Sequence, residues 1–172
     1  PVLWGLEKRD QGENRFVAND QVTTQLQAIV PLCDLIVGTD EEIHILGGTT
    51  DTIAALRAIR AKTSALIVLK LGAQGCAVFA GAIPEAVEEG LVVPGFPVEV
   101  FNVLGAGDAF MAGFLRGWLR NEKIERCCEI ANAAGAIVVS RHGCAPAMAT
   151  WAEMQHFLAM PSRPFRLREA DD

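Results

Sequence analysis

The sequence predicts an α/β layered domain, and three observations predict it. Short runs of β-branched and other apolar residues, such as 65–69, are typical of strands in a sheet that is covered on both faces. In the first half of the chain such runs alternate with helical segments, and two longer helical segments follow each other in the second half. The chain has 172 residues, of which 51% are hydrophobic. This size and composition fit one globular domain with a sizeable core.

The first half of the chain reads as alternating helices and strands. Gly38 ends a strand, Gly47-Gly48 breaks a short helix, and Thr50-Asp51 provides a cap for the next helix. A short strand is expected at the very start, followed by a polar loop. The expected elements are strand 1–4, loop 7–14, helix 20–32, strand 34–37, helix 40–46 and a further helix through Ala61.

The second half holds the remaining strands and the longest helices. The connection between strands 65–69 and 76–80 contains glycines and suggests a hairpin-like turn. Pro94 and Pro97 separate two further short strands, and Thr150 and Glu153 have the spacing of a capping box. The expected elements are strands 91–93 and 98–100 and helices 107–119, 124–139 and 150–158.

Composition and charge exclude several classes of protein. The formal net charge of −6 argues against broad binding to nucleic acid or to an anionic membrane surface. The sequence contains no apolar run long enough to cross a bilayer, and its start lacks the layout of a signal peptide. Its five cysteines form no Cys-x-x-Cys pair, so we expect buried reduced thiols rather than a zinc site. The expected location is the cytoplasm.

Gly105-Ala106-Gly107-Asp108 is the most informative stretch of the chain. It places glycines at the mouth of a helix, where unpaired N–H groups and the helix dipole favour an anion such as phosphate. A carboxylate at that place repels a phosphate, so Asp108 is unusual unless it accepts a proton from an attacking hydroxyl during phosphoryl transfer. The ordinary alternative is that Asp is favoured in the first turn of any helix.

Two other stretches could contact a ligand. Lys70, Gly72 and Gly75 follow a strand and form either a tight turn with a solvated lysine or a backbone wall against a nucleotide. Glu41 and Glu42 follow strand 34–37 at the carboxyl edge of the sheet, where open α/β folds bind ligands. These acids either favour the start of a helix or, at Glu42, hold a water bound to Mg²⁺.

Two common nucleotide-binding motifs are absent from the sequence. No glycine is followed by lysine, as the Walker pattern requires, and Phe110 stands where the dinucleotide fingerprint needs its third glycine. An NAD-dependent oxidoreductase is therefore disfavoured. A kinase and a catalytically silent nucleotide-binding module remain open, and Asp108 favours the kinase because a silent module does not need a carboxylate in an anion hole.

The chain resembles the ribokinase-like (phosphofructokinase-B) family of sugar kinases. Residues 102–114, Asn-Val-Leu-Gly-Ala-Gly-Asp-Ala-Phe-Met-Ala-Gly-Phe, match the C-terminal signature of that family. The resemblance implies a three-layer α/β/α sandwich and ATP-dependent phosphorylation of a sugar or sugar-acid hydroxyl. It implies these site residues: the base Asp108; an anion hole of Gly105, Ala106 and Gly107; nucleotide contacts from Lys70, Gly72, Gly75 and Asn132; and a water-linked Mg²⁺ at Glu42.

Within the family, the chain looks most like the kinases that act on 5-dehydro-2-deoxygluconate in inositol breakdown, with 2-keto-3-deoxygluconate as the alternative substrate. Residues 1–4, the Asn-Val-Leu start of the signature and residues 141–148 suggest this. Thr39 stands where the family often has Asn, and Asn102 and Leu104 replace a frequent Asp and Thr. The family binds a monovalent cation such as K⁺ near Asn102 and the loop 141–143.

The resemblance covers only the C-terminal part of a family member. Residues 1–160 correspond to the nucleotide half of the kinase domain with its base, and 161–172 read as a linker or tail leading to a further domain. The family's N-terminal strands, its Gly-Gly sugar contact and its lid lie upstream of this sequence. We therefore expect the chain alone to phosphorylate no sugar and to form homo-oligomers through an open sheet edge.

Overall fold

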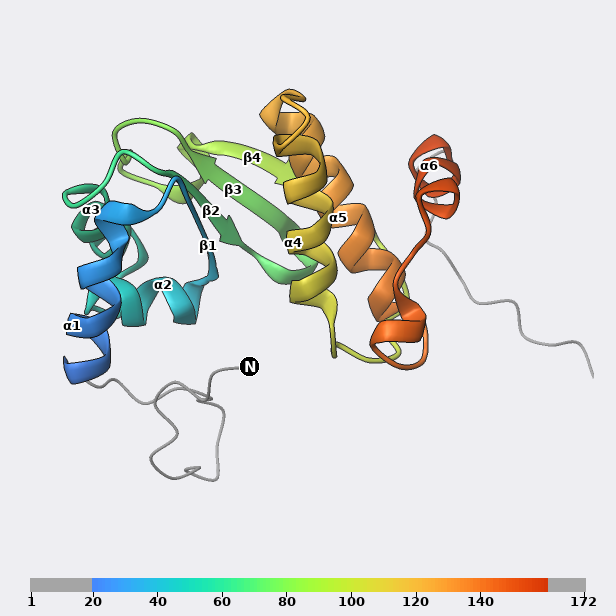
Figure 1. Cartoon of the computed structure of the whole chain (residues 1–172), viewed down its shortest axis with the longest axis horizontal. Helices are drawn as coiled ribbons and strands as arrows, with labels where there is room; N and C mark the ends of the chain where they lie inside the picture. Colours follow the sequence, from blue (N-terminus) through green and yellow to red (C-terminus); the bar gives the residue numbers. More distant parts are fainter. Residues whose placement is uncertain (1–19, 161–172) are drawn as a thin grey trace, which may run out of the picture. The chain divides into compact units, whose positions relative to one another are not determined.

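The computed structural model describes residues 20–160, which fall into two compact units (Figure 1). The first unit comprises the described residues up to Leu71 together with 77–92, and the second comprises 72–76 and the described residues from Val93 onward. The predicted strand 1–4, loop 7–14 and tail 161–172 lie outside the described residues. The elements are α1 (Asp20–Ile29), β1 (Leu35–Thr39), α2 (Asp40–Gly47), α3 (Thr52–Arg60), β2 (Leu66–Lys70), β3 (Gly75–Phe79), β4 (Leu91–Pro94), α4 (Ala106–Trp118), α5 (Ile124–Val139) and α6 (Trp151–Ala159).

The strands form one sheet in the order β1-β2-β3-β4. β1 and β2 are parallel, with Leu35 opposite Leu66 and Thr39 opposite Lys70. Parallel neighbours need a long crossover connection, which α2 and α3 supply. The register therefore brings the carboxyl ends of β1 and β2 to the same edge of the sheet.

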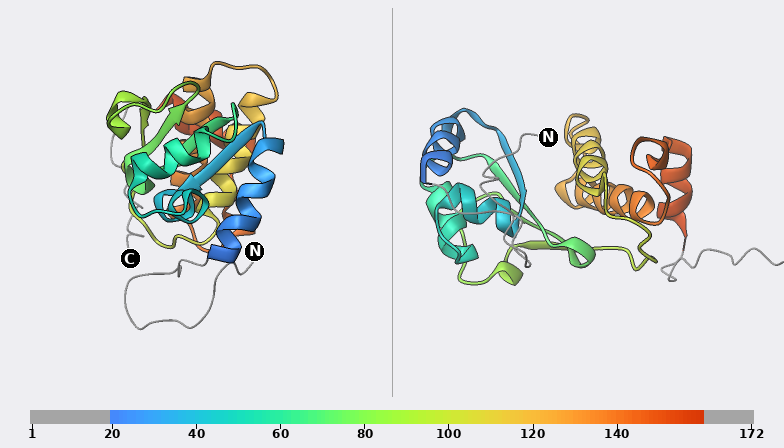
Figure 2. Two further views of the ribbon diagram at one scale, coloured as in Figure 1. Left: turned by 90° about the vertical axis from the view of Figure 1, so that its left-hand side faces the viewer. Right: turned by 90° about the horizontal axis from the view of Figure 1, so that it is seen from below.

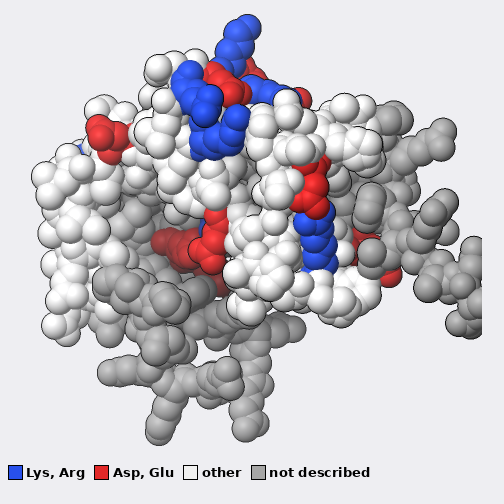
Figure 3. Space-filling view, turned by 45° about the vertical axis from the view of Figure 1, so that its right-hand side comes forward, with Lys and Arg blue, Asp and Glu red and all other residues white. Residues whose placement is uncertain are grey.

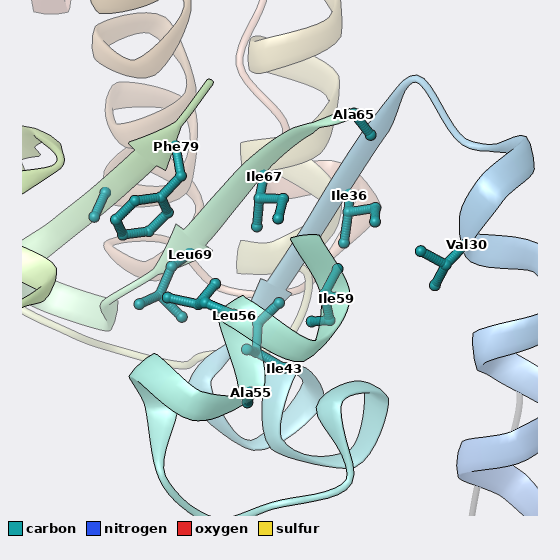
Figure 4. Packing of buried hydrophobic residues seen from close by; sticks show 11 residues of the cluster. Val30, Ile36, Ile43, Ala55, Leu56, Ile59, Ala65, Ile67, Leu69 and Phe79 are labelled. Atoms are coloured by element: carbon teal, nitrogen blue, oxygen red, sulfur yellow. The ribbon is translucent and has the colours of Figure 1, made fainter. Parts of the chain in front are cut away.

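Buried apolar side chains hold the first unit together (Figure 4). Leu56 and Ile59 of α3 and Ile43 of α2 pack with Ile67 and Leu69 of β2, and each of these side chains is at most 1% exposed. Burying a side chain of this size stabilises a fold by about 1.5–3 kcal/mol. The core therefore fixes the strand ends and the start of α2 that follows β1.

Two helices, α4 and α5, form the centre of the second unit and lie side by side in both views of Figure 2. Their close approach depends on glycine. A Cβ on Gly113 would lie 2.9 Å from the carbonyl oxygen of Ile130, and one on Gly117 would lie 2.9 Å from Sγ of Cys127. Because residues four apart share one helix face, the two glycines form a single contact surface for α5.

Most of the predicted elements are confirmed, and one is wrong. α5 has the predicted bounds, and the predicted capping box of α6 is present, with Thr150 and Glu153 bonded reciprocally. The strand predicted at 98–100 does not form: regular pairing is limited to a single bridge at Val98. Pro97 has no N–H group to donate to a ladder, and Val100 is 57% exposed, so neither pairing nor burial supports a strand.

The connection between β2 and β3, predicted as a hairpin-like turn, contains a short 3-10 turn at Gly72–Gln74.

On the face drawn in Figure 3, Lys and Arg side chains lie beside Asp and Glu side chains rather than forming a broad basic field. Within residues 20–160, no helix is both long enough and apolar enough to span a membrane.

Candidate active site

Gly105 shapes the start of α4. It is the N-cap residue and has a φ of 86°, in the left-handed region that residues with side chains rarely adopt. A Cβ at this position would lie 2.5 Å from Sγ of Cys144, so the nearby Cys144 also leaves no room for a side chain at position 105. The helix begins directly after it, since the N–H of Ala109 donates to the carbonyl of Gly105 at 2.9 Å.

The first turn of α4 presents N–H groups that no described residue accepts. Ala106 donates to the carbonyl of Val103 at 3.3 Å. The N–H groups of Gly107 and Asp108 have no partner within the described part of the chain, and the helix has no side-chain cap. Such groups, together with the positive end of the helix dipole, form a site that suits a phosphate.

Asp108 differs from the acids at the third position of α2 and α6. Its side chain is exposed, and among residues 20–160 it accepts no hydrogen bond and forms no ion pair. Glu42 in α2 and Glu153 in α6 occupy the same third helical position, but each accepts the backbone N–H of its N-cap threonine. The carboxylate of Asp108 therefore makes no capping bond and is available to a ligand.

Asn102 ties the approach to α4 to the loop after α5. Its Nδ2 donates to the carbonyls of Arg141 and Gly143, at 3.1 Å each. Its Oδ1 accepts the N–H of Leu104 at 2.6 Å. The segment that leads into α4 is thus held by a side chain that uses its donors and its acceptor at once.

Glu42 is held from two sides at the carboxyl end of β1. Its Oε2 accepts the N–H of Thr39 at 2.7 Å and lies 3.4 Å from Nζ of Lys70. The hydroxyl of Thr39 in turn accepts the N–H of Glu42 at 3.3 Å, which completes a capping box. Gly38 leaves room for this side chain, since a Cβ there would lie 3.2 Å from Cβ of Glu42.

The donor set at Glu42 fits a cation that is bound through water. The Glu42 side chain is 48% exposed, and its second oxygen has no partner among residues 20–160. The same residues contain no cluster of three or more His, Cys, Asp or Glu side chains suited to a metal. A single carboxylate supplemented by waters and nucleotide phosphates is a common arrangement for Mg²⁺, so Glu42 fits that role.

Lys70 and the glycines after it have different surroundings. Lys70 ends β2 opposite Thr39, and within the described residues its ammonium pairs with Glu42. Gly72 has a φ of 59° and open space around its α-carbon. Gly75 has a φ of 101°, and a Cβ there would collide with the backbone after Val93. The nucleotide contacts predicted for these residues remain predictions.

Asn132 has a structural partner set in the second unit. It is 7% exposed, and its Nδ2 donates to the carbonyls of Val93 at 3.1 Å and Pro94 at 3.0 Å. Cys128, one turn earlier on α5, is fully buried, and a hydrogen bond to Cys76 together with burial raises the pKa of its thiol. Asn132 thus anchors the end of β4, and its predicted nucleotide contact also remains a prediction.

Several contacts of these residues were not identified from the sequence. The pairing of Lys70 with Glu42 depends on the strand register, which no local motif encodes. The bridge made by Asn102 depends on a segment about 40 positions further along the chain. The contact between Gly105 and Cys144 has the same long-range origin. For the bridge made by Asn102, the sequence offers one signal, which is that Asn102 stands where the family often has Asp.

Comparison with known proteins gives the class to which this chain belongs. The pattern of the pfkB family carbohydrate kinases matches residues 9–151. The chain is a member of this family, as the signature at 102–114 predicted.

Three relatives illustrate the range of the similarity. The 5-dehydro-2-deoxygluconokinase of Geobacillus kaustophilus is 31% identical over 130 residues, which are 73% of this chain and 37% of that protein. The ATP-dependent ribose-1-phosphate kinase of Halopiger xanaduensis is 50% identical over 52 residues, which are 30% of this chain and 18% of that protein. A crystal structure of fructokinase from Vibrio cholerae O395 with fructose, ADP and calcium ion is 28% identical.

The fructokinase comparison also confirms the predicted ribokinase-like fold. Its TM-score is 0.69, with 84% of this chain and 47% of the fructokinase covered. A double mutant of the same fructokinase with fructose, ADP and potassium ion is 29% identical, with a TM-score of 0.68 and coverage of 81% and 45%. The chain spans less than half the length of these relatives, and 37% of the Geobacillus kaustophilus kinase.

Proposed function

We propose that this chain supplies the phosphate-binding half and the catalytic base of an ATP-dependent carbohydrate kinase. Residues 1–160 would form the C-terminal part of the kinase domain, and 161–172 a linker or tail. The observation that carries the proposal is that, among residues 20–160, the carboxylate of Asp108 and the N–H groups of Gly107 and Asp108 at the start of α4 have no partner. Family membership supports the same assignment.

The chemistry follows from the charges at the start of α4. In phosphoryl transfer the protein mainly positions the reactants and stabilises the charge on the transferred group. Gly105, Ala106 and Gly107 would surround the phosphate with backbone, and the N–H groups at Gly107 and Asp108 would donate to its oxygens. Asp108 would accept the proton of the attacking sugar hydroxyl. Mg²⁺, when bound through water at Glu42, would neutralise part of the charge of the ATP phosphates.

The sugar is proposed from the relatives. The kinase of Geobacillus kaustophilus is named for 5-dehydro-2-deoxygluconate and matches 73% of this chain, so this sugar acid is the first candidate. 2-Keto-3-deoxygluconate is the alternative sugar acid. The match to a ribose-1-phosphate kinase is stronger in identity but covers only 30% of this chain, so it supports the shared phosphate-binding half rather than a particular sugar.

The proposed location is the cytoplasm. All five cysteines are free thiols, which suits that location.

ADP release from the full-length gene product tests the proposed function. The protein is supplied with ATP and Mg²⁺ and a panel of sugars that contains both sugar acids and fructose. We expect release that depends on 5-dehydro-2-deoxygluconate. Nucleotide binding without turnover on any sugar would instead favour the silent nucleotide-binding module.

The 172-residue chain, assayed in parallel, tests the assignment of the sugar pocket. Without residues that orient the acceptor hydroxyl, the reaction loses an effect worth about 7–11 kcal/mol in well-oriented systems. We therefore expect no sugar-dependent turnover from this chain alone. Turnover near that of the full-length protein would place the acceptor site within these 172 residues.

A further inference from the structure

Asn102 joins two segments that meet at one end of the α4–α5 pair. In Figure 1, the start of α4 and the end of α5 lie at the same end of these two helices. The carbonyls of Arg141 and Gly143 both point at Nδ2 of Asn102, at 3.1 Å each. The backbone N–H of Asn102 also donates to the carbonyl of Val139 at 3.2 Å, so the residue is bonded to the end of α5 through its backbone as well.

Two carbonyl oxygens that converge on one point need hydrogen-bond donors or a cation between them. An amide NH₂ group offers two N–H donors in one plane and carries no net charge, so it can satisfy two carbonyls at once. An alkali cation can do the same, because carbonyl oxygens can replace the water around a potassium ion. The structure fills this place with the NH₂ group of Asn102, and the donor set therefore does not suit a cation at that point.

The charge at this position decides which partner is needed. A carboxylate in place of the amide would have no hydrogen to donate and would face two carbonyl oxygens of like partial charge. Such a site becomes stable only when a cation lies between the three oxygen groups. The family pattern often has Asp here, and a related fructokinase was crystallised with a potassium ion.

We infer that the side-chain amide of Asn102 replaces a monovalent cation in this protein, so that the anion site of α4 is assembled without potassium. The inference rests on the proposed kinase function. The Oδ1 of Asn102 accepts the N–H of Leu104, the residue before Gly105, so the amide that bridges the two carbonyls also positions the start of α4. Asn102 is thus a positioning residue that acts through the backbone of the anion site.

The first test compares wild-type protein in potassium chloride and in choline chloride at equal ionic strength. Sugar-dependent ADP release by the full-length gene product is expected to be the same in both salts. The melting temperature is expected to be the same as well, because an ion that binds the folded state would raise it. Activation by potassium, or a higher melting temperature in potassium chloride alone, would overturn the inference.

The second test uses Asn102→Asp, which keeps the shape of the side chain and removes its donors. In choline chloride we expect turnover to fall by at least about tenfold. The carbonyls of Arg141 and Gly143 lose their hydrogen bonds to the amide and face a charged carboxylate instead. Potassium chloride should restore a large part of that turnover and raise the melting temperature of the variant. Asn121→Asp, at an exposed position after α4, is the matched control and should respond to neither salt.

The two tests separate this inference from the proposed function. If the wild type releases no ADP with any sugar, the kinase proposal fails, and the melting temperatures still decide whether a potassium site exists. If Asn102→Asp does not fold, the wild-type comparison still decides. If Asn102→Asp folds and loses activity equally in both salts, the amide is not standing in for a cation and the inference is wrong.

Discussion

Within residues 20–160, three helices carry an acid at their third position, and these acids have different partners. In α6, Glu153 accepts the N–H and the hydroxyl of Thr150, both at 2.8 Å. In α2, Glu42 accepts the N–H of its N-cap residue and pairs with Lys70. In α4, Asp108 has no such partner among residues 20–160. The same position along a helix therefore gives a structural acid, a shared acid and a free acid.

The N-cap residue explains the difference. α2 and α6 begin after threonines, whose hydroxyls accept the N–H of the third residue while the acid reaches back. α4 begins after Gly105, which has no side chain and a positive φ, so the reciprocal bonds cannot form. Of these three helix starts, the one in α4 lacks a side-chain cap and leaves N–H groups and a carboxylate for a ligand.

The largest expected effect concerns the free acid. Asp108→Asn in the full-length gene product should lower kcat by at least ~10²-fold, the usual size of the loss of a general base. Binding of ATP, measured by calorimetry, should stay close to that of the wild type. Glu153→Gln is the control, because its acid has the same helical position and is bonded within the chain; it should leave kcat unchanged.

The next effect concerns the anion site. Gly107 is exposed in the first turn of α4, so Gly107→Val should fold, while its side chain crowds the approaching phosphate. Hydrogen bonds to charged groups contribute about 1.5–3 kcal/mol, so ATP affinity in calorimetry should fall by roughly tenfold or more. Unchanged affinity in a folded variant would remove α4 from the nucleotide site.

The start of α4 could be predicted from the sequence, and its surroundings could not. Glycines and an acid before an apolar run encode an uncapped helix start locally, and Asp108 was identified on that basis. The bridge from Asn102 to Gly143 was not, because it joins residues that are 41 positions apart. Glu42 was proposed for Mg²⁺ without its partner, since Lys70 meets it only through the parallel register of β1 and β2. The β-branched residues at 98–100 predict a strand, but it does not form, because Pro97 has no N–H group to donate.

A smaller effect concerns the shared acid. The side chains of Lys70 and Glu42 are 20% and 48% exposed, so their pairing should contribute only about 0.2–1 kcal/mol to the free energy of unfolding. A double-mutant cycle with Lys70→Met and Glu42→Gln, followed by urea unfolding, measures this coupling. A second cycle, in which Lys62→Met at an exposed position replaces Lys70→Met, is the matched control and should show no coupling with Glu42→Gln. Fully additive effects of the two substitutions would show that the ion pair contributes nothing.

The smallest effect concerns the structural acid and its pH dependence. A backbone hydrogen bond from Thr150, with further bonds from its hydroxyl and from Arg141, lowers the pKa of Glu153 from 4.5 to about 2. Because the folded state favours the ionised form of Glu153, this carboxylate stabilises the fold fully above pH 4.5. The stabilisation is lost as the pH falls toward 2. The melting temperature of Glu153→Gln should therefore lie below that of the wild type at pH 7, and the two should converge near pH 2. A difference that persists at acid pH would mean that the ionised form is not what stabilises α6.

Single-turnover phosphoryl transfer tests the role of the free acid most directly, because it separates the chemical step from product release. Full-length protein is mixed in excess over γ-labelled ATP with saturating sugar, and labelled sugar phosphate is followed in the wild type, Asp108→Asn and Glu153→Gln. Our account predicts that transfer becomes at least ~10²-fold slower in Asp108→Asn alone, with ATP still bound. Transfer at the wild-type rate in a folded Asp108→Asn protein would contradict the assignment of Asp108 as the base.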